Sequence, residues 1–128
     1  MAERILLVDD DEGFLLAAGR LLEAAGYDIT RATSAAEARG ELEAGLPDLI
    51  LLDVIMPEQD GFSFADEVAK NDNLADIPVV LVTAVAENAG QMMHAFETGQ
   101  GLPAADILPK SMAHTDLVKT VAAVLGKS

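Results

Sequence analysis

The sequence predicts one α/β domain in which a parallel sheet carries helices on both faces. Short continuous apolar runs alternate with segments of helical apolar spacing, and glycine and proline separate the two kinds of segment. Half of the residues are apolar (51%) and only 4% are aromatic, so the expected core consists of Leu, Val, Ile and Ala. A chain of 128 residues is expected to form a single domain over 1–128.

The first strand and the first helix are the most regular elements of the pattern. Residues 5–8 are all apolar, which predicts a buried strand over 4–9 because strands covered on both faces lose the polar alternation. Apolar residues three and four positions apart predict a helix over 12–25, and Gly26 is expected to end it.

The second strand and helix are predicted from weaker signals. Residues 28–32 mix polar and apolar side chains, so this strand is expected nearer an edge of the sheet. Ser34 and Glu37 have the spacing of a capping box, which opens a helix that runs to about Ala44 and stops at Gly45.

The third and fourth strands are again short apolar runs, over 49–52 and 79–82. Between them, residues 56–61 form a loop, and a helix is expected over 62–71. Pro78 fits only at the beginning of the fourth strand, since proline donates no ladder hydrogen bond.

The C-terminal part completes the alternation. It predicts a less regular helix over 87–97, a loop over 99–103, the fifth strand over 105–108 and a last helix over 115–125.

Four of the five predicted strands end in polar residues. In an open parallel sheet the carboxyl ends of the strands border the ligand crevice, so these residues are expected to come together. They are Asp9 and Asp10 after the first strand, Asp53 after the third, Thr83 after the fourth and Lys110 after the fifth.

The aspartates indicate a cation site. Adjacent carboxylates repel each other, and Mg²⁺ uses few protein carboxylates together with water and phosphate oxygens. Asp9, Asp10 and Asp53 suit such a site, and Asp53 could also act as a nucleophile toward phosphorus. The alternative is that Asp9 and Asp10, with Asp11 and Glu12, merely complement the positive end of the following helix. Taken singly, Thr83 would be a strand-end cap and Lys110 a solvated lysine.

Composition excludes several other classes. A formal charge of −14 argues against direct nucleic-acid binding and favours partners with basic or apolar surfaces. The chain has no cysteine and no apolar stretch long enough for a membrane span, so a cytoplasmic protein without a membrane partner is expected.

The chain resembles the receiver domains of response regulators in two-component signalling over essentially its whole length. The resemblance rests on residues 5–11, on 47–57 with Asp60 and Gly61, on 82–84, and on Lys110. It implies a flavodoxin-like, doubly wound sheet of five strands in the order 2-1-3-4-5, with five flanking helices. It also implies a signalling domain rather than an enzyme, one that assists its own phosphorylation and slow dephosphorylation.

The resemblance assigns roles to the strand-end residues. Asp53 would accept a phosphoryl group from a histidine kinase, a phosphotransfer protein or a small phosphodonor. Mg²⁺, with Mn²⁺ as an alternative, would be held by Asp10, Asp53 and the main-chain carbonyl of Ile55, and Asp9 would act through metal-bound water. Thr83 and Lys110 would bind the phosphoryl oxygens.

The resemblance also implies the output. Phosphorylation would alter the face made by helix 4, strand 5 and helix 5, which would bind a downstream protein, and phosphorylation-linked dimerisation is an open alternative. Three departures from the family pattern affect this switch. Pro109 precedes Lys110 instead of following it, Ile107 replaces an aromatic residue, and residues 99–103 lengthen the connection before strand 5.

Two other function classes stay open at this point. One is a degenerate receiver-like module that binds partners without phosphorylation. The departures from the family pattern near Lys110 leave this class open. A phosphohydrolase with an Asp nucleophile would want a second acid two residues after Asp53, where this chain has Ile55.

Overall fold

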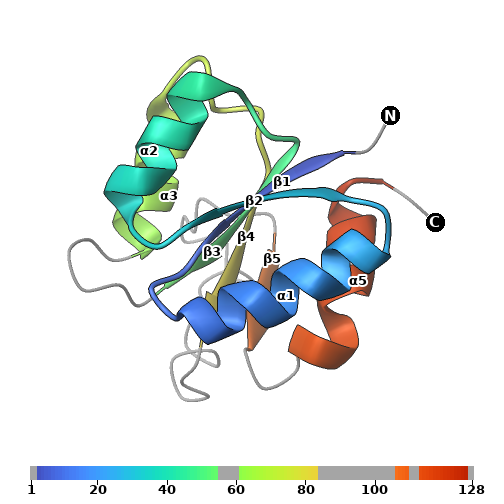
Figure 1. The fold of residues 1–128 in the computed structure, drawn as a ribbon. Helices are drawn as coiled ribbons and strands as arrows, with labels where there is room; N and C mark the ends of the chain where they lie inside the picture. Colours follow the sequence, from blue (N-terminus) through green and yellow to red (C-terminus); the bar gives the residue numbers. More distant parts are fainter. Residues whose placement is uncertain (1–2, 55–60, 84–105, 110–112, 127–128) are drawn as a thin grey trace.

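The computed structural model describes residues 3–54, 61–83, 106–109 and 113–126 (Figure 1). Its elements in chain order are β1 (Arg4–Val8), α1 (Glu12–Ala24), β2 (Asp28–Ala32), α2 (Ala35–Ala44), β3 (Leu49–Asp53), α3 (Gly61–Lys70), β4 (Val79–Thr83), β5 (Asp106–Pro109) and α5 (Ala113–Val124). The expected helix over 87–97 and the loop over 99–103 lie outside the described residues. Among the described residues, no helix is long and apolar enough to cross a bilayer.

The strands form one parallel sheet in the order β2-β1-β3-β4-β5. Helices α2 and α3 cover one face, and α1 and α5 cover the other (Figure 1). The predicted parallel α/β class is confirmed, and so is the edge position of β2. Four of the five expected helices fall within the described residues.

The two faces of the sheet explain why the strands are continuously apolar. Successive side chains of a strand point to opposite faces. Ile5 and Leu7 therefore pack in the core under α1 and α5, whereas Leu6 and Val8 pack in the core under α2 and α3. Since both cores exclude water, neither set of positions can be polar.

Helix α1 ends at a glycine, as predicted. Gly26 has a φ of +100°, which side chains other than glycine rarely adopt. Its N–H donates to the carbonyl of Glu23, and the N–H of Tyr27 donates to that of Leu22. These bonds, with Leu22 and Tyr27 buried in the same core, form a Schellman motif that satisfies the last carbonyls of the helix.

The edge strand β2 is fastened to α1 by Arg31. Its Nε donates to the carbonyl of Leu15 at 3.1 Å, and its Nη2 lies 3.4 Å from Oε1 of Glu23. A Cβ at Gly19 would collide with the Arg31 guanidinium. A larger residue at position 19 would have to displace this guanidinium from Leu15 and Glu23.

The start of α2 differs in detail from the predicted capping box. Ser34 Oγ accepts from the N–H of Glu37 at 3.1 Å, as expected. The Glu37 carboxylate, however, accepts from both the hydroxyl and the N–H of Thr33, each at 2.6 Å, and not from the N–H of Ser34. Both hydrogen bonds lower the pKa of Glu37 below its ordinary value, and the bond from the Thr33 hydroxyl has the larger effect.

Candidate functional site

The structure brings three carboxylates together at the carboxyl ends of β1 and β3. Val8 pairs with Leu52 in the sheet, so Asp9 and Asp53, each one residue further along, end neighbouring strands at the same level. One carboxylate oxygen from each of Asp9, Asp10 and Asp53 lies within 4.8 Å of the other two. The sequence predicted this grouping from the strand ends alone.

The three aspartates differ in exposure. Asp9 is 1% exposed and Asp53 is 4% exposed, whereas Asp10 is exposed to solvent. Buried carboxylates are rare, and several in one place repel each other strongly unless a cation or hydrogen-bond donors offset their charge. The cluster is therefore partly enclosed on the sheet side and open to a ligand on the Asp10 side.

The turn after β1 fixes the position of Asp9. The Asp9 N–H donates to the carbonyl of Ala32 at 3.1 Å, which ties this residue to the end of β2. The Asp9 Oδ1 accepts from the N–H of Asp11 at 2.8 Å. One Asp9 oxygen thus orients the backbone at the point where the chain enters α1.

Asp11 has a structural role beside the site in addition to its charge at the helix end. It is the N-cap of α1, and its Oδ1 accepts from the N–H of Phe14 at 3.2 Å. A Cβ at Gly13 would lie 3.2 Å from the same oxygen, so glycine leaves room for the cap. An aspartate three positions before an N–H of the first turn is the signal that could have revealed this role.

We expect Asp11→Ala to destabilise the domain by about 1 kcal/mol, the usual cost of losing an N-cap side chain. Asp11→Asn keeps a capping oxygen and should retain the wild-type stability. Urea unfolding of the three proteins measures both differences. Equal stability of the alanine variant and the wild type would show that the cap contributes nothing.

Asp53 lies in the middle of the sheet. Its Cα pairs with that of Val82 on β4, and the N–H of Val54 donates to the carbonyl of Val82 at 2.9 Å. Thr83 is the last residue of β4 and lies one position beyond the Asp53–Val82 pair. Asp53 thus stands between the end of β1 and the end of β4.

The other predicted site residues are only partly described. The backbone of Thr83 pairs with Pro109, the last residue of β5, which directly precedes Lys110 in the sequence. Lys110 and Ile55 themselves lie outside the described residues.

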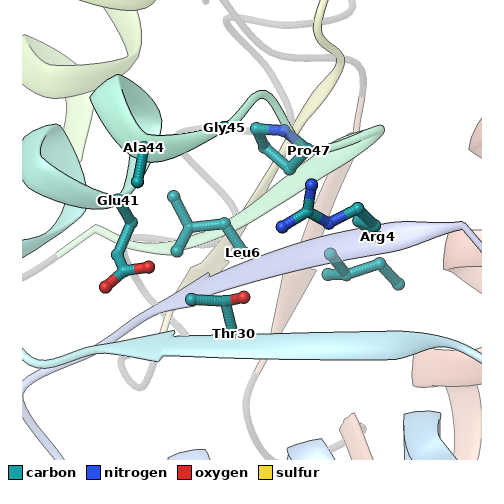
Figure 2. Close-up of a pocket in the computed structure, with 8 residues that line it drawn as sticks. Arg4, Leu6, Thr30, Glu41, Ala44, Gly45 and Pro47 are labelled. Atoms are coloured by element: carbon teal, nitrogen blue, oxygen red, sulfur yellow. The ribbon is translucent and has the colours of Figure 1, made fainter.

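A small cavity elsewhere does not extend this site. It has a volume of about 40 Å³ and lies beside β1 and β2, against the end of α2 (Figure 2). Figure 2 shows Arg4, Thr30 and Glu41 around it, and none of the three aspartates lines it. This volume has room for a few water molecules and not for a substrate.

Comparison with known proteins identifies the family. Residues 5–122 match the response regulator receiver domain. The chain is 31% identical over 125 residues to the DNA-binding dual master transcriptional regulator RpaA of Synechocystis sp., a match that covers 98% of this chain and 50% of RpaA. The chain thus spans about half the length of such curated relatives.

Solved structures agree with the sequence match. A CheY-like response regulator receiver domain protein from Methanospirillum hungatei is 25% identical, with a TM-score of 0.82 over 98% of this chain and 95% of that one. The response regulator protein TrrA from Thermotoga maritima, in complex with Mg²⁺–BeF, is 27% identical, with a TM-score of 0.79 over 95% of this chain and 98% of that one. With the family match over residues 5–122, these similarities show that the chain belongs to the response regulator receiver domains of two-component signalling.

Proposed function

We propose that this domain accepts a phosphoryl group on Asp53 in a reaction that requires Mg²⁺ or Mn²⁺. The observation that carries the proposal is the approach of Asp9, Asp10 and Asp53, whose carboxylate oxygens lie within 4.8 Å of one another. Such a set of hard oxygen donors fits a small divalent cation that retains water. The similarity to TrrA, which has been solved with Mg²⁺–BeF, supports the same kind of site here.

Asp10 and Asp53 would hold the cation directly, together with the main-chain carbonyl of Ile55, and Asp9 would hold it through water. When bound, the cation offsets the negative charge of the carboxylates and of the incoming phosphoryl group. The burial of Asp9 and its bond to the Asp11 N–H suit a residue that orients a water rather than one that reaches into solvent.

The proposed transfer uses one oxygen of Asp53 as the nucleophile. This oxygen forms a bond to phosphorus while the bond between phosphorus and the donor breaks, and the bonding electron pair leaves with the donor. With a phosphohistidine donor the leaving atom is an imidazole nitrogen, and with acetyl phosphate it is an acetate oxygen. Either way, an aspartyl phosphate remains on the domain.

Thr83 and Lys110 are proposed to bind the phosphoryl oxygens. The end of β4 places the Thr83 backbone beside the Asp53 strand, and a hydroxyl there can donate to an oxyanion. Lys110 would contribute a positive charge. The donor is proposed to be a histidine kinase or phosphotransfer protein, and phosphorylation would change the surface presented to a downstream partner.

The test is labelling with acetyl phosphate, read by intact-mass spectrometry. We expect one phosphoryl group per chain with Mg²⁺ or Mn²⁺, and none with excess EDTA. A continuous release of many phosphates per chain without an adduct would favour a phosphohydrolase. The absence of any adduct, with acetyl phosphate and with a phosphohistidine donor, would favour a receiver-like module that acts without phosphorylation.

A further inference from the structure

A groove lies between α2 and the segment that follows α3. It has a volume of about 480 Å³. Leu42, Leu46 and Leu74 supply its apolar surface, and Arg39, Glu43 and Glu67 are among its polar lining residues. Figure 1 shows α2 and α3 next to each other on one face of the sheet.

The groove has a half-open apolar surface. Leu42 is 7% exposed and Leu74 packs against the core beneath, so both form a fixed floor. Leu46, by contrast, is 52% exposed, the largest value among the exposed large apolar side chains of the described residues. An exposed leucine next to a buried apolar floor forms an apolar patch that a side chain of a partner can cover.

The elements that border the groove carry a net negative charge. Helices α2 and α3 and residues 71–78 carry seven carboxylates and two basic side chains. Both basic side chains are already bonded to carboxylates: Arg39 to Glu67 at 2.7 and 2.8 Å, and Lys70 to Asp66 at 2.8 Å. Of the other five carboxylates, that of Glu43 lines the groove, those of Asp72 and Asp76 are in the segment that follows α3, and those of Glu37 and Glu41 lie elsewhere on α2.

This charge selects among occupants. A second copy of the chain would bring another formal charge of −14 to the same surface, and nucleic acid or an anionic membrane would also be repelled. A segment that presents leucine-like anchors between lysine or arginine residues satisfies both the apolar floor and the acidic surroundings. Such a segment would dock as an amphipathic helix in a groove.

We propose that this groove, called the α2–α3 groove below, binds a basic, amphipathic segment of a partner protein. The aspartates lie at the carboxyl ends of the strands, whereas the groove lies toward their amino ends. Leu46 precedes the start of β3, and Leu74 precedes the start of β4. Docking there leaves the open Asp10 side of the aspartate cluster uncovered, so the partner can stay bound while the domain is phosphorylated and dephosphorylated.

The experiment titrates the isotope-labelled domain with a short synthetic peptide of leucine and arginine that places leucine on one helical face. We expect amide shifts confined to the second half of α2, Leu46, Glu67 and residues 71–74. Leu46→Asn should weaken binding by about fivefold, since part of a buried leucine contact is lost. Glu43→Gln should weaken binding less and reduce its salt dependence.

The matched control is Leu16→Asn on α1, on the opposite face of the sheet, where leucine is 49% exposed. This variant should bind the peptide as the wild type does. Both leucines are on the surface, and an unchanged amide spectrum outside the site verifies that each variant is folded. A scrambled peptide of equal composition should bind at least about fivefold more weakly than the amphipathic one.

Several results would overturn the proposal. These are no binding, equal binding of the scrambled peptide, shifts spread over both faces of the sheet, or equal effects of Leu16→Asn and Leu46→Asn. A dimer of the free domain that Leu46→Asn dissociates would show that a second copy covers the groove instead.

Discussion

Asp53→Asn is expected to abolish phosphoryl labelling of the domain and to leave its fold intact. An amide oxygen is a far weaker nucleophile than a carboxylate, and the variant also removes one charged ligand from the cation site. Asp53 is only 4% exposed, but asparagine has nearly the same shape as aspartate. The residues around it should therefore not need to repack. Intact-mass spectrometry after incubation with acetyl phosphate and Mg²⁺ measures the labelling.

The matched control is Asp28→Asn at the start of β2. This aspartate makes only a long contact of 4.0 Å with Arg4, and its side chain is 67% exposed. The control loses the same charge but should label as the wild type does. If Asp53→Asn took up as much phosphoryl group as Asp28→Asn, another residue would be the acceptor.

The sheet was predictable because its strands are buried on both faces. In β1 and β3, every apolar residue in the run packs into one of the two cores, so the run itself marks the strand. Gly26 marked the end of α1 because only glycine adopts its backbone conformation at low cost. For α5 the sequence predicts a start at residue 115, whereas the helix begins two residues earlier, at Ala113. Its core positions, Leu117 and Val121, carry the periodic signal and lie further along the helix.

The grouping of the aspartates was predictable for a related reason. Parallel strands end at one edge, so Asp9, Asp10 and Asp53 had to be neighbours once the runs before them were strands. Their unequal exposure was not predictable, because it depends on how the turn after β1 packs. The hydrogen bonds from Asp11 to Asp9 and from Thr33 to Glu37 were not predictable either. Each carboxylate has several backbone donors nearby, and residue spacing does not determine which of them it binds.

The α2–α3 groove could not be read from the sequence at all. Its floor joins Leu42 of α2 to Leu74 of the turn that follows α3, and these residues meet only in the folded core. Sequence periodicity identifies which face of a helix is apolar, but not the space left between that helix and a neighbouring turn.

Asp10→Asn is expected to weaken Mg²⁺ binding by about 10-fold or more and to raise the stability of the metal-free domain slightly. The variant replaces a charged ligand by a neutral one, and even the loss of a residue that only orients a ligand often costs a metal site about 10-fold in affinity. It also removes one of three carboxylates whose oxygens lie within 4.8 Å, so their repulsion decreases. A 10-fold loss of affinity lowers the Mg²⁺-induced stabilisation at saturating metal by about 1.4 kcal/mol.

Thermal melts with and without Mg²⁺ measure both effects, and Asp11→Asn is the matched control. Asp11 is the next residue along the chain, and its side chain bonds to Phe14 N–H, a contact that asparagine retains. Both variants lose one unit of negative charge near the site, so general electrostatic attraction for Mg²⁺ falls in both. Only loss of a ligand predicts that Asp10→Asn loses most of the Mg²⁺-induced rise in Tm while Asp11→Asn keeps it. If the two variants lost the same part of this rise, Asp10 would act on the cation through its charge alone and not as a ligand.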